Sequence, residues 1–365
     1  MTHTTTLAFV GDIFLSGSYR DVPDAAQRRM FEGLAGALQN CSLVFGNFEG
    51  VVMAEEPSGL VPDKIRMSVA PAYLPALRAA GIDVLSLSNN HVFDYGPAAF
   101  EASRGALDRA GFTVFGAGLS DDEALAPVSR VVDGLSVGFL GFTCASTNPA
   151  ATGTGGFGVA LRQRTDILER VAAARRGCDL LVVSLHWGEE HVAWPSPDQL
   201  KFARALVDAG ADIVAGHHAH VFQGVDPYRH GVIAYGLGGV TIGSLRQRVM
   251  WSGVAHDYHF EPQPRHRRGA IMSVDIRNKR VAGVRVTPVT IGEDGRPHAR
   301  AGARMPMSWR LAPVVWRLPG YAAFFRAVLF MQFRLVPRVR WLLNGSAWRR
   351  LKRAWFSVGQ RENIE

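Results

Sequence analysis

A layered α/β fold is predicted by two features of this 365-residue sequence. Short apolar runs alternate with stretches of helical period from the N-terminus to about Gly239. Hairpin signals at Asp133-Gly134 and Asn278-Lys279 add antiparallel strands. This mixture favours two sheets packed as a sandwich and flanked by helices over one purely parallel sheet. Hydrophobic residues make up 47% of the chain and charged residues 20%, which excludes a largely disordered polypeptide.

The expected elements of the first half alternate along the chain. Gly81 stops the second helix, and the third begins at Pro97 and ends before Gly111, because proline favours the first helical position and glycine the position after the last. The expected strands are residues 7–10, 43–45 and 84–87, and the expected helices are residues 25–38, 72–80 and the one that begins at Pro97.

The second half begins with a hairpin over residues 131–143 and continues the alternation. Ser196-Pro197-Asp198-Gln199 offers an N-cap serine, a proline at the first helical position and a capping-box glutamine, and Gly210 ends that helix. The other expected helix is residues 165–176. The other expected strands are residues 180–185, 213–215 and 232–235, with a final hairpin, 271–276 and 281–286, that adds antiparallel edges.

Positive charge is concentrated at the end of the chain. Residues 1–309 hold 29 Lys and Arg against 30 Asp and Glu, whereas residues 310–365 hold 11 against 2. Arg326, Arg334 and Arg338 recur there at helical spacing among aromatic residues, which suits an amphipathic helix at an anionic membrane surface. The alternative is a helical extension whose aromatic face packs on the sandwich. Nucleic acid is not expected as a partner, because no recognised binding module accompanies the charge.

A cytoplasmic location is expected, with the basic segment in peripheral contact with the inner membrane surface. The N-terminus lacks a basic signal region, and Arg326 interrupts the apolar residues 321–333 before they reach the roughly 18 uncharged residues that a membrane span needs. The three cysteines lie far apart without a CxxC motif, so no structural disulfide is expected. We expect a folded domain over residues 1–300 and a basic, aromatic-rich helical tail over residues 301–365.

Polar side chains with metal-ligand chemistry recur at the ends of the predicted strands. Each alone has an ordinary explanation, such as a turn, a loop or a core histidine with its hydrogen bonds made. Together they lie where α/β sheets gather ligands, so the pattern predicts one shared metal site. The residues are Asp12, Asn47, Glu49, Asn89, Asn90, His91, Asp94, His186, His217, His218 and His220.

The ligand types predict the class of metal. Carboxylate, amide oxygen and imidazole without thiolate argue against an iron–sulfur or structural zinc site, and for one or two ions of Mn, Fe, Zn or Mg in a hydrolytic centre. Two ions about 3.5 to 4 Å apart can position a water, lower its pKa and bind both the attacking and the leaving oxygen. A spare histidine beside them could protonate the leaving group.

Several blocks of the sequence resemble the bacterial capsule-synthesis CapA (poly-γ-glutamate capsule) family, which is related to the calcineurin-like metallophosphoesterases. The similarity runs in order from about Thr4 to Gly239, roughly two thirds of the chain. Its specific blocks are His186-Trp187-Gly188-x-Glu190 and Gly216-His217-His218-x-His220. The others are Gly11-Asp12, Asn47-Phe48-Glu49, Asn89-Asn90-His91 with Asp94-Tyr95-Gly96, and residues 195–210.

This resemblance implies a four-layer α-β-β-α sandwich of the metallophosphoesterase type with a metal cleft at the strand ends. It implies His91 as the proton donor to the leaving oxygen, and we place Asp94 with it in the catalytic group. Whether His217 replaces His218 as a ligand stays open. The implied ligands are Asp12, Glu49 and His220 for one metal and Asn90, His186 and His218 for a second, with Glu49 as a candidate bridge.

The sequence departs from the related families in two places. The run Asp12-Ile13-Phe14 lacks the histidine of the usual Asp-x-His motif, so one metal lacks an imidazole. Residues 235–240 lack the Ser and Asn of the family's Tyr-Ser-Leu-Gly-Asn-Phe block, so either substrate handling has changed or glycine permits a tighter backbone. Trp187 could stack on substrate or pack under the cleft, and Arg66 could meet an anionic substrate or lie solvated in a loop.

Two functions of different classes follow from these features. The first is a metal-dependent, phosphoesterase-like hydrolase in capsule or exopolymer biosynthesis, with a phosphoester or an anionic polymer as its substrate. The second is a noncatalytic, membrane-associated assembly component that binds a polymer such as polyglutamate in the retained metal cleft. Turnover of a phosphodiester with added Mn distinguishes the two.

Overall fold

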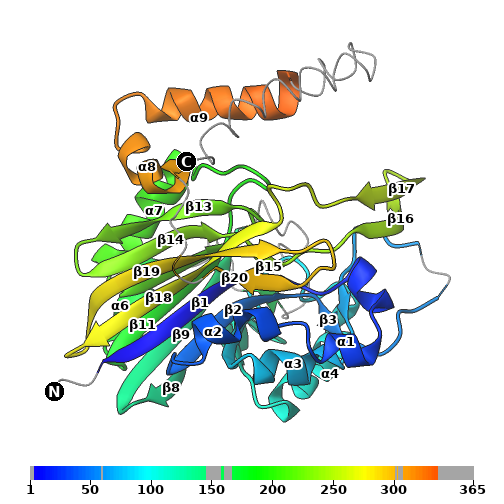
Figure 1. The fold of residues 1–365 in the computed structure, drawn as a ribbon, viewed down its shortest axis with the longest axis horizontal. Helices are drawn as coiled ribbons and strands as arrows, with labels where there is room; N and C mark the ends of the chain where they lie inside the picture. The colour runs from blue at the N-terminus through cyan, green and yellow to red at the C-terminus, as the bar shows by residue number, and fades with distance from the viewer. Residues whose placement is uncertain are drawn as a thin grey trace. The chain divides into compact units, whose positions relative to one another are not determined.

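The structure is a computed structural model that describes residues 4–58, 61–144, 158–159, 167–300, 302 and 307–335. The chain forms two compact units, Met1–Pro313 and Val314–Glu365. The first unit has a mixed α/β fold (Figure 1).

Two large sheets form the frame of the first unit within the described residues. The eight-stranded sheet runs in the order β20 (Pro297–Ala299), β19 (Arg280–Ile291), β18 (Arg268–Arg277), β1 (Thr5–Phe14), β2 (Leu43–Glu49), β5 (Ile82–Ser86) and β6 (Thr113–Phe115), and β15 (Gly239–Thr241) pairs with β1. The six-stranded sheet runs in the order β13 (Phe222–Tyr228), β14 (Gly231–Leu237), β12 (Ile213–His217), β11 (Leu180–His186), β9 (Leu135–Thr143) and β8 (Val128–Val132).

The inner faces of these two sheets share a hydrophobic core. Successive side chains of a strand point to opposite faces, so Phe45 of β2 lies in this core while Val44 packs on the outer face. The ring of Phe45 stacks on Phe139 of β9 with the centroids 6.3 Å apart. Contacts of this kind join the eight-stranded sheet to the six-stranded one.

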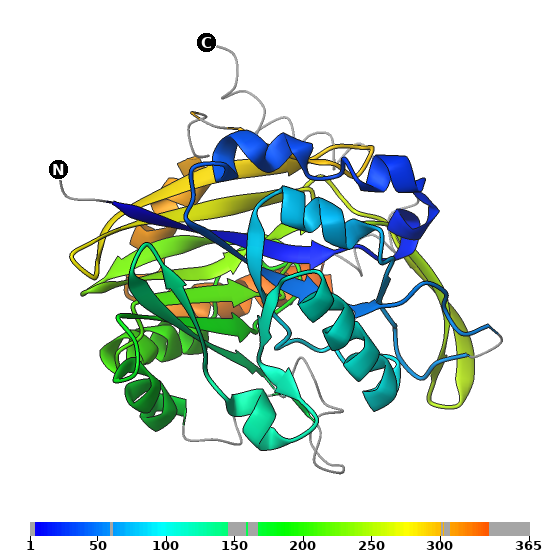
Figure 2. The ribbon, with the colours of Figure 1, turned by 90° about the horizontal axis from the view of Figure 1, so that it is seen from below.

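Helices cover the outer faces of the sheets. The helices α3 (Tyr73–Ala79) and α4 (Gly96–Arg109) bury Leu77 and Phe100 in a second core that includes the outer face of the eight-stranded sheet. The helices α6 (Ile167–Arg175) and α7 (Pro197–Asp208) contact the six-stranded sheet, and they appear in green on its outer side in Figure 2. The remaining short helices of this unit are η1 (Gly17–Asp21), α1 (Asp24–Gln27), η2 (Glu32–Leu34), α2 (Ala35–Leu38) and α5 (Asp121–Leu125).

The local signals read from the sequence are confirmed at three places. The Ser196 hydroxyl accepts from the Gln199 amide at 3.1 Å and the Gln199 side chain accepts from the Ser196 amide at 2.8 Å, which is the expected capping box of α7. The two expected hairpins form, β8–β9 about Asp133-Gly134 and β18–β19 about Asn278-Lys279. Both residues of each turn have positive φ, as two-residue hairpin turns require.

Other expectations are wrong. The single helix expected over residues 25–38 is divided into α1, η2 and α2, and Gly33 lies so close to the Pro297 carbonyl that a Cβ would approach it to 2.4 Å. The strand β18 lies inside its sheet beside β1, not at an edge. Several elements were not expected at all: the hairpin β16 (Leu245–Trp251) and β17 (Val254–Phe260), and the short strands β3 (Val51–Val52), β4 (Ser68–Val69), β7 (Ala117–Gly118) and β10 (Gly158–Val159).

The described part of the second unit is helical. The helix α8 (Met307–Val315) runs across the division between the units, and α9 (Tyr321–Phe330) is followed by a π-helical turn over Met331–Leu335. None of the helices in the described ranges combines the length and the hydropathy that crossing a bilayer requires. The basic tail after residue 335, with Arg338, lies outside the described residues.

Candidate metal centre

Parallel strand pairing brings the predicted ligands together at the strand ends. Asp12 of β1 lies opposite Asn47 of β2 in one sheet, and His186 of β11 lies opposite His217 of β12 in the other. All four side chains are buried. Because the carboxyl ends of parallel strands meet at one edge of a sheet, each sheet delivers its polar side chains as a group.

A close backbone contact fixes Asp12. Its amide donates to the Gly238 carbonyl at 2.8 Å, and a Cβ on Gly11 would lie 1.7 Å from that same oxygen. Gly238 has φ +70°, in the left-handed region that favours glycine. The glycines of residues 235–240 therefore support the tighter backbone, one of the two explanations that the sequence left open.

Two carboxylates and one imidazole gather at the end of β1 and β2. The Asn47 amide donates to Asp12 Oδ1 at 3.0 Å and to Glu49 Oε1 at 2.9 Å. His220 Nδ1 lies 3.1 Å from Asp12 Oδ2, and His220 Nε2 lies 3.9 Å from Glu49 Oε2. Glu49 Oε2 is buried and has no hydrogen-bond partner among the described residues. A buried acceptor without a donor is a position that a cation can fill.

Three further ligand atoms converge beside this group. His186 Nε2 lies 2.8 Å from Asn90 Oδ1 and 3.0 Å from His218 Nδ1. A single proton on Nε2 cannot satisfy both neighbours, so the lone pairs of an amide oxygen and imidazole nitrogens point toward one another. His218 has φ +86°, a conformation that bulky residues rarely adopt and that often marks functional sites. Together with the buried Glu49 oxygen, this donor set fits a divalent transition metal.

The structure groups the ligands differently from the assignment that the resemblance implies. Two sets of three residues each place one ligand atom within 4.8 Å of the others: Asp12, Glu49 and His186, and Glu190, His218 and His220. Glu190 was not among the predicted ligands. The His-Trp-Gly-x-Glu block contains it, and Gly188 with φ +91° turns the chain between it and His186.

The structure distinguishes His217 from His218. His217 Nδ1 lies 3.3 Å from Asp12 Oδ1, at ion-pair distance, and its ring packs 5.7 Å from the ring of Phe45. His218 is the histidine that faces His186 and Asn90. His217 therefore lies on the Asp12 side of the site, packed against the core. Whether either residue binds metal stays a prediction.

His91 and Asp94 form a hydrogen-bonded pair beside Asn90. His91 Nδ1 lies 2.8 Å from Asp94 Oδ2, and His91 Nε2 lies 3.0 Å from Asn90 Nδ2. The Asp94 side chain is fully buried and also accepts from the Met67 amide at 2.7 Å and pairs with the Lys64 ammonium at 2.7 Å. Asp94 thereby fixes the orientation of the imidazole. The sequence did not single out Lys64, because the loop that brings it to Asp94 carries no motif.

Electrostatics at the carboxylate group favour a cation. Burial raises the pKa of Asp12, but the His217 and His220 imidazoles outweigh it and hold the pKa well below its ordinary value. Burial and the charge of Asp12 raise the pKa of Glu49 well above its usual range. Burial lowers the pKa of His220, yet the Glu49 and Asp12 carboxylates outweigh it and raise that pKa to about 10. Positive charge is therefore stabilised between these carboxylates.

The histidines of the second group are neutral near pH 7. Burial lowers the pKa of His218 to about 4 and holds the pKa of His186 well below its ordinary value. A neutral imidazole has a lone pair available for a metal, so neither residue has to lose a proton to become a ligand at neutral pH.

Two residues that the sequence left open are now placed. Trp187 is fully buried and donates from Nε1 to the Tyr235 carbonyl at 3.0 Å, so it packs inside the unit and does not stack on a substrate. The Arg66 guanidinium lies 5.6 Å from the centre of the Tyr95 ring, and its main chain bonds the side chain of Gln247. Arg66 is therefore packed on a neighbour and is not a freely solvated loop charge.

Comparison with known proteins identifies relatives for the larger unit. Capsule biosynthesis protein CapA of Bacillus anthracis is 34% identical over 240 residues, which cover 64% of this chain and 58% of that protein. PGA biosynthesis protein CapA of Bacillus subtilis (strain 168) is 30% identical over 233 residues, 63% of this chain and 61% of that protein. The match thus spans about three fifths of the length of each relative. Among solved structures, a 5'-nucleotidase precursor from Thermus thermophilus covers 90% of this chain and 60% of its own, with 17% identity and a TM-score of 0.45, too low to carry an argument.

The family itself is given by a sequence profile. The profile described as bacterial capsule synthesis protein PGA_cap matches residues 6–243, well over half of the chain. These residues include every ligand candidate and the His91–Asp94 pair. The chain therefore belongs to the bacterial capsule synthesis protein PGA_cap family, as its sequence blocks predicted.

Proposed function

We propose that this protein is a metal-dependent, phosphoesterase-like hydrolase that acts in the synthesis of a capsule of the poly-γ-glutamate type. The names of its relatives, which refer to capsule and PGA biosynthesis, support the pathway. The chemistry is supported by one observation above all: Asn90 links a convergent set of ligand atoms, through His186, to the His91 imidazole. We further propose that the first unit is the four-layer α-β-β-α sandwich of the metallophosphoesterases and that it binds two divalent ions of Mn, Fe, Zn or Mg.

In this proposal each ligand candidate has a role in holding metal. A bound divalent cation supplies Lewis acidity and an activated water. Asn47 holds the two carboxylates of the site in place through its hydrogen bonds to both. The ligands are Asp12, Glu49, Asn90, His186, His218 and His220, with Glu190 added from the structure and His217 beside Asp12.

His91 acts as the general acid. Its Nδ1 faces the buried Asp94 carboxylate, so the proton available for transfer is the one on Nε2. The imidazolium that carries this proton is stabilised by Asp94, and Nε2 lies beside Asn90 at the edge of the ligand set. From there it can protonate the oxygen that leaves when a phosphoester or similar bond breaks.

The second candidate function is a noncatalytic polymer-binding or assembly component. It is favoured by Phe14, which stands where the related enzymes have the imidazole of Asp-x-His and packs against Met67 and Leu245. A site with one ligand fewer can retain metal and bind an anionic polymer without turning it over.

Turnover separates the two functions. The full chain, purified without chelator and supplied with Mn, is assayed on a generic phosphodiester and on a panel of γ-glutamyl peptides. The hydrolase proposal predicts turnover that Asp12→Ala and His186→Ala abolish. Stoichiometric metal with no hydrolysis of any panel member would instead establish the binding component.

We also propose that the basic tail makes peripheral contact with an anionic membrane surface and that nucleic acid is not a partner. Exposed aromatic side chains along its described part support this, with Phe324, Phe330 and Phe333 each 40% to 56% exposed. Arg326, on the helix α9, adds a positive charge beside them.

A further inference from the structure

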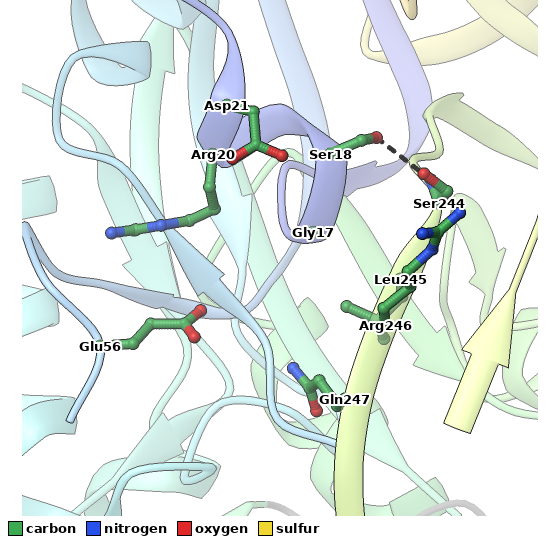
Figure 3. A pocket seen from close by; sticks show the side chains of 9 residues that line it. All are labelled: Gly17, Ser18, Arg20, Asp21, Glu56, Ser244, Leu245, Arg246 and Gln247. Carbon is green, nitrogen blue, oxygen red and sulfur yellow. Dashed lines mark hydrogen bonds between the residues drawn. The ribbon is translucent and has the colours of Figure 1, made fainter. Parts of the chain in front are cut away.

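A polar cavity lies beyond the end of β1, apart from the ligand candidates. Its volume is about 490 Å³, within the range of small-molecule sites. Figure 3 shows its walls, which come from η1, from the loop after β3 and from the start of β16. The lining residues are Gly17, Ser18, Arg20, Asp21, Glu56, Ser244, Leu245, Arg246 and Gln247.

Specific contacts hold these walls together. The Ser18 amide donates to the Ser244 carbonyl at 2.9 Å, and the Ser244 amide donates back to the Ser18 hydroxyl at 3.1 Å. Gly17 has φ +63°, and a Cβ there would lie 2.1 Å from the Ser244 carbonyl oxygen, so no other residue fits without displacement. The Arg20 guanidinium donates to the carbonyls of Met53 and Ala54 at 2.9 and 2.6 Å, which anchors the chain just before Glu56.

The lining carries charges of both signs. Arg20 and Arg246 supply guanidinium groups, and Asp21 and Glu56 supply carboxylates. Leu245 is the one large apolar side chain among the lining residues, so an apolar ligand would leave charges without partners. A purely anionic ligand such as inorganic phosphate would meet two carboxylates. This wall selects a ligand that itself carries both an ammonium and a carboxylate.

The cavity is connected to the proposed proton donor through one loop. Gln247 in its wall accepts from the Arg66 amide at 2.9 Å and donates to the Arg66 carbonyl. Two residues earlier, the Lys64 ammonium pairs with Asp94, which holds His91. The same loop therefore borders both the cavity and the candidate catalytic pair.

We propose that this cavity binds the α-ammonium and α-carboxylate head of a glutamyl residue, either free glutamate or the amino end of a γ-linked glutamate chain. The choice of glutamate rests on the proposed function in capsule synthesis. Glu56, oriented by a hydrogen bond from the Ser68 hydroxyl, binds the ammonium together with Asp21. Arg246 and the Ser18 hydroxyl bind the carboxylate. Arg246 is free to turn toward it, because its pairing with Glu261 at 3.7 Å is exposed to solvent.

Calorimetric titration of the full chain tests this assignment. The probes are γ-glutamylglutamate, its N-acetyl derivative and free glutamate, each with and without EDTA. We expect γ-glutamylglutamate to bind in both conditions and the N-acetyl derivative to bind at least about tenfold more weakly, because acetylation removes the ammonium. Tighter binding of the dipeptide than of free glutamate identifies a chain end as the ligand, and equal binding identifies the amino acid head alone.

Matched variants locate the site. Glu56→Gln and Arg246→Gln should each weaken the dipeptide about tenfold. Glu101→Gln and Arg280→Gln, which alter exposed charges elsewhere, should not. The assignment is overturned if the N-acetyl derivative binds equally well or if both cavity variants bind like the wild type.

Two outcomes separate this inference from the proposed function. Dipeptide binding that is lost in Asp12→Ala and kept in both cavity variants would place the glutamyl ligand at the metal centre, so the cavity assignment fails while the substrate class stands. Metal-dependent turnover of a phosphodiester without binding of any glutamyl probe would reject the cavity assignment and leave the hydrolase.

Discussion

His91 and its neighbours show how single residues prepare this site for chemistry. Asp94 lies out of contact with solvent and takes donors from His91, Lys64 and the Met67 amide. With its acceptors engaged, the carboxylate cannot rotate, so the imidazole it holds has one orientation. A general acid held in this way is ready before substrate arrives, which is the main requirement for proton transfer.

Replacement of His91 should remove the acid without removing metal. We expect His91→Gln to lower turnover of the phosphodiester by about 10²- to 10⁴-fold at unchanged metal content, since general acids contribute that much. Asp94→Asn should lower turnover less and shift the acidic limb of its pH profile. His230→Gln, which changes an exposed histidine, is the control. Loss of metal in His91→Gln would assign this residue to the ligand set instead.

A histidine outside the metal site gives a pH dependence of stability. Burial, aided by Arg265, lowers the pKa of His266 to about 4, and its Nδ1 accepts from the Gln263 amide at 3.1 Å. The unfolded chain, with an ordinary histidine pKa near 6.5, therefore binds more protons between pH 6.5 and 4. The stability that neutral His266 contributes is complete above about pH 6.5 and is lost as the pH falls toward 4.

This dependence can be measured by thermal unfolding. We expect the Tm of the metal-free protein to fall from pH 7.5 to pH 5, and His266→Gln to reduce that fall by the equivalent of on the order of 1 to 2 kcal/mol. Identical Tm differences in the variant and the wild type would show that His266 is not the group responsible.

At the scale of elements, the sequence predicted what depends on neighbouring residues in the chain. The capping box of α7 and the turns at Asp133-Gly134 and Asn278-Lys279 need only local chemistry, and all three form. The helix expected over residues 25–38 failed because its interruption depends on a contact with Pro297, far away in the sequence. The hairpin β16–β17 has no strong turn signal, and its recognition requires the fold around it.

The contact of β1 with the turn before β15 should be intolerant of any side chain at Gly11. We expect Gly11→Ala to destabilise the protein by about 1 to 3 kcal/mol and to lower metal affinity, because the new Cβ would displace the carbonyl that holds Asp12. Gly36→Ala is the control, since nothing lies within 4 Å of its Cβ position in α2. It should be neutral or stabilise by about 0.4 to 1 kcal/mol. Equal Tm values for the two variants would contradict the role given to this contact.

At the scale of the whole molecule, the candidate site exists because two sheets each bring a group of polar side chains to their strand ends. Sequence blocks identified most of this set, since glycines, histidines and carboxylates mark strand ends even without a structure. The division of ligands between the two groups could not be read from them. It depends on rotamers and on the left-handed turns at His218 and His220, which also bring Glu190 within reach.

The tail gives a separate prediction for the second unit. We expect the full chain to co-sediment with liposomes rich in phosphatidylglycerol, and deletion of residues 310–365 to abolish this while leaving metal binding intact. Phe324→Ser with Phe330→Ser should weaken it too, because both side chains are exposed on α9. Val131→Ser, on the first unit, serves as the control. Unchanged co-sedimentation of the deletion variant would reject membrane contact by the tail.

Metal content tests the central claim most directly. We predict that the full chain, purified without chelator and equilibrated with Mn, retains about two equivalents of metal by elemental analysis, as a two-ion hydrolytic centre requires. His186→Ala and His218→Ala should each lose at least one equivalent, while His230→Gln keeps the wild-type content. Stoichiometric metal that is unchanged in both ligand variants, or no retained metal in the wild type, would contradict the assignment of these side chains to a metal centre.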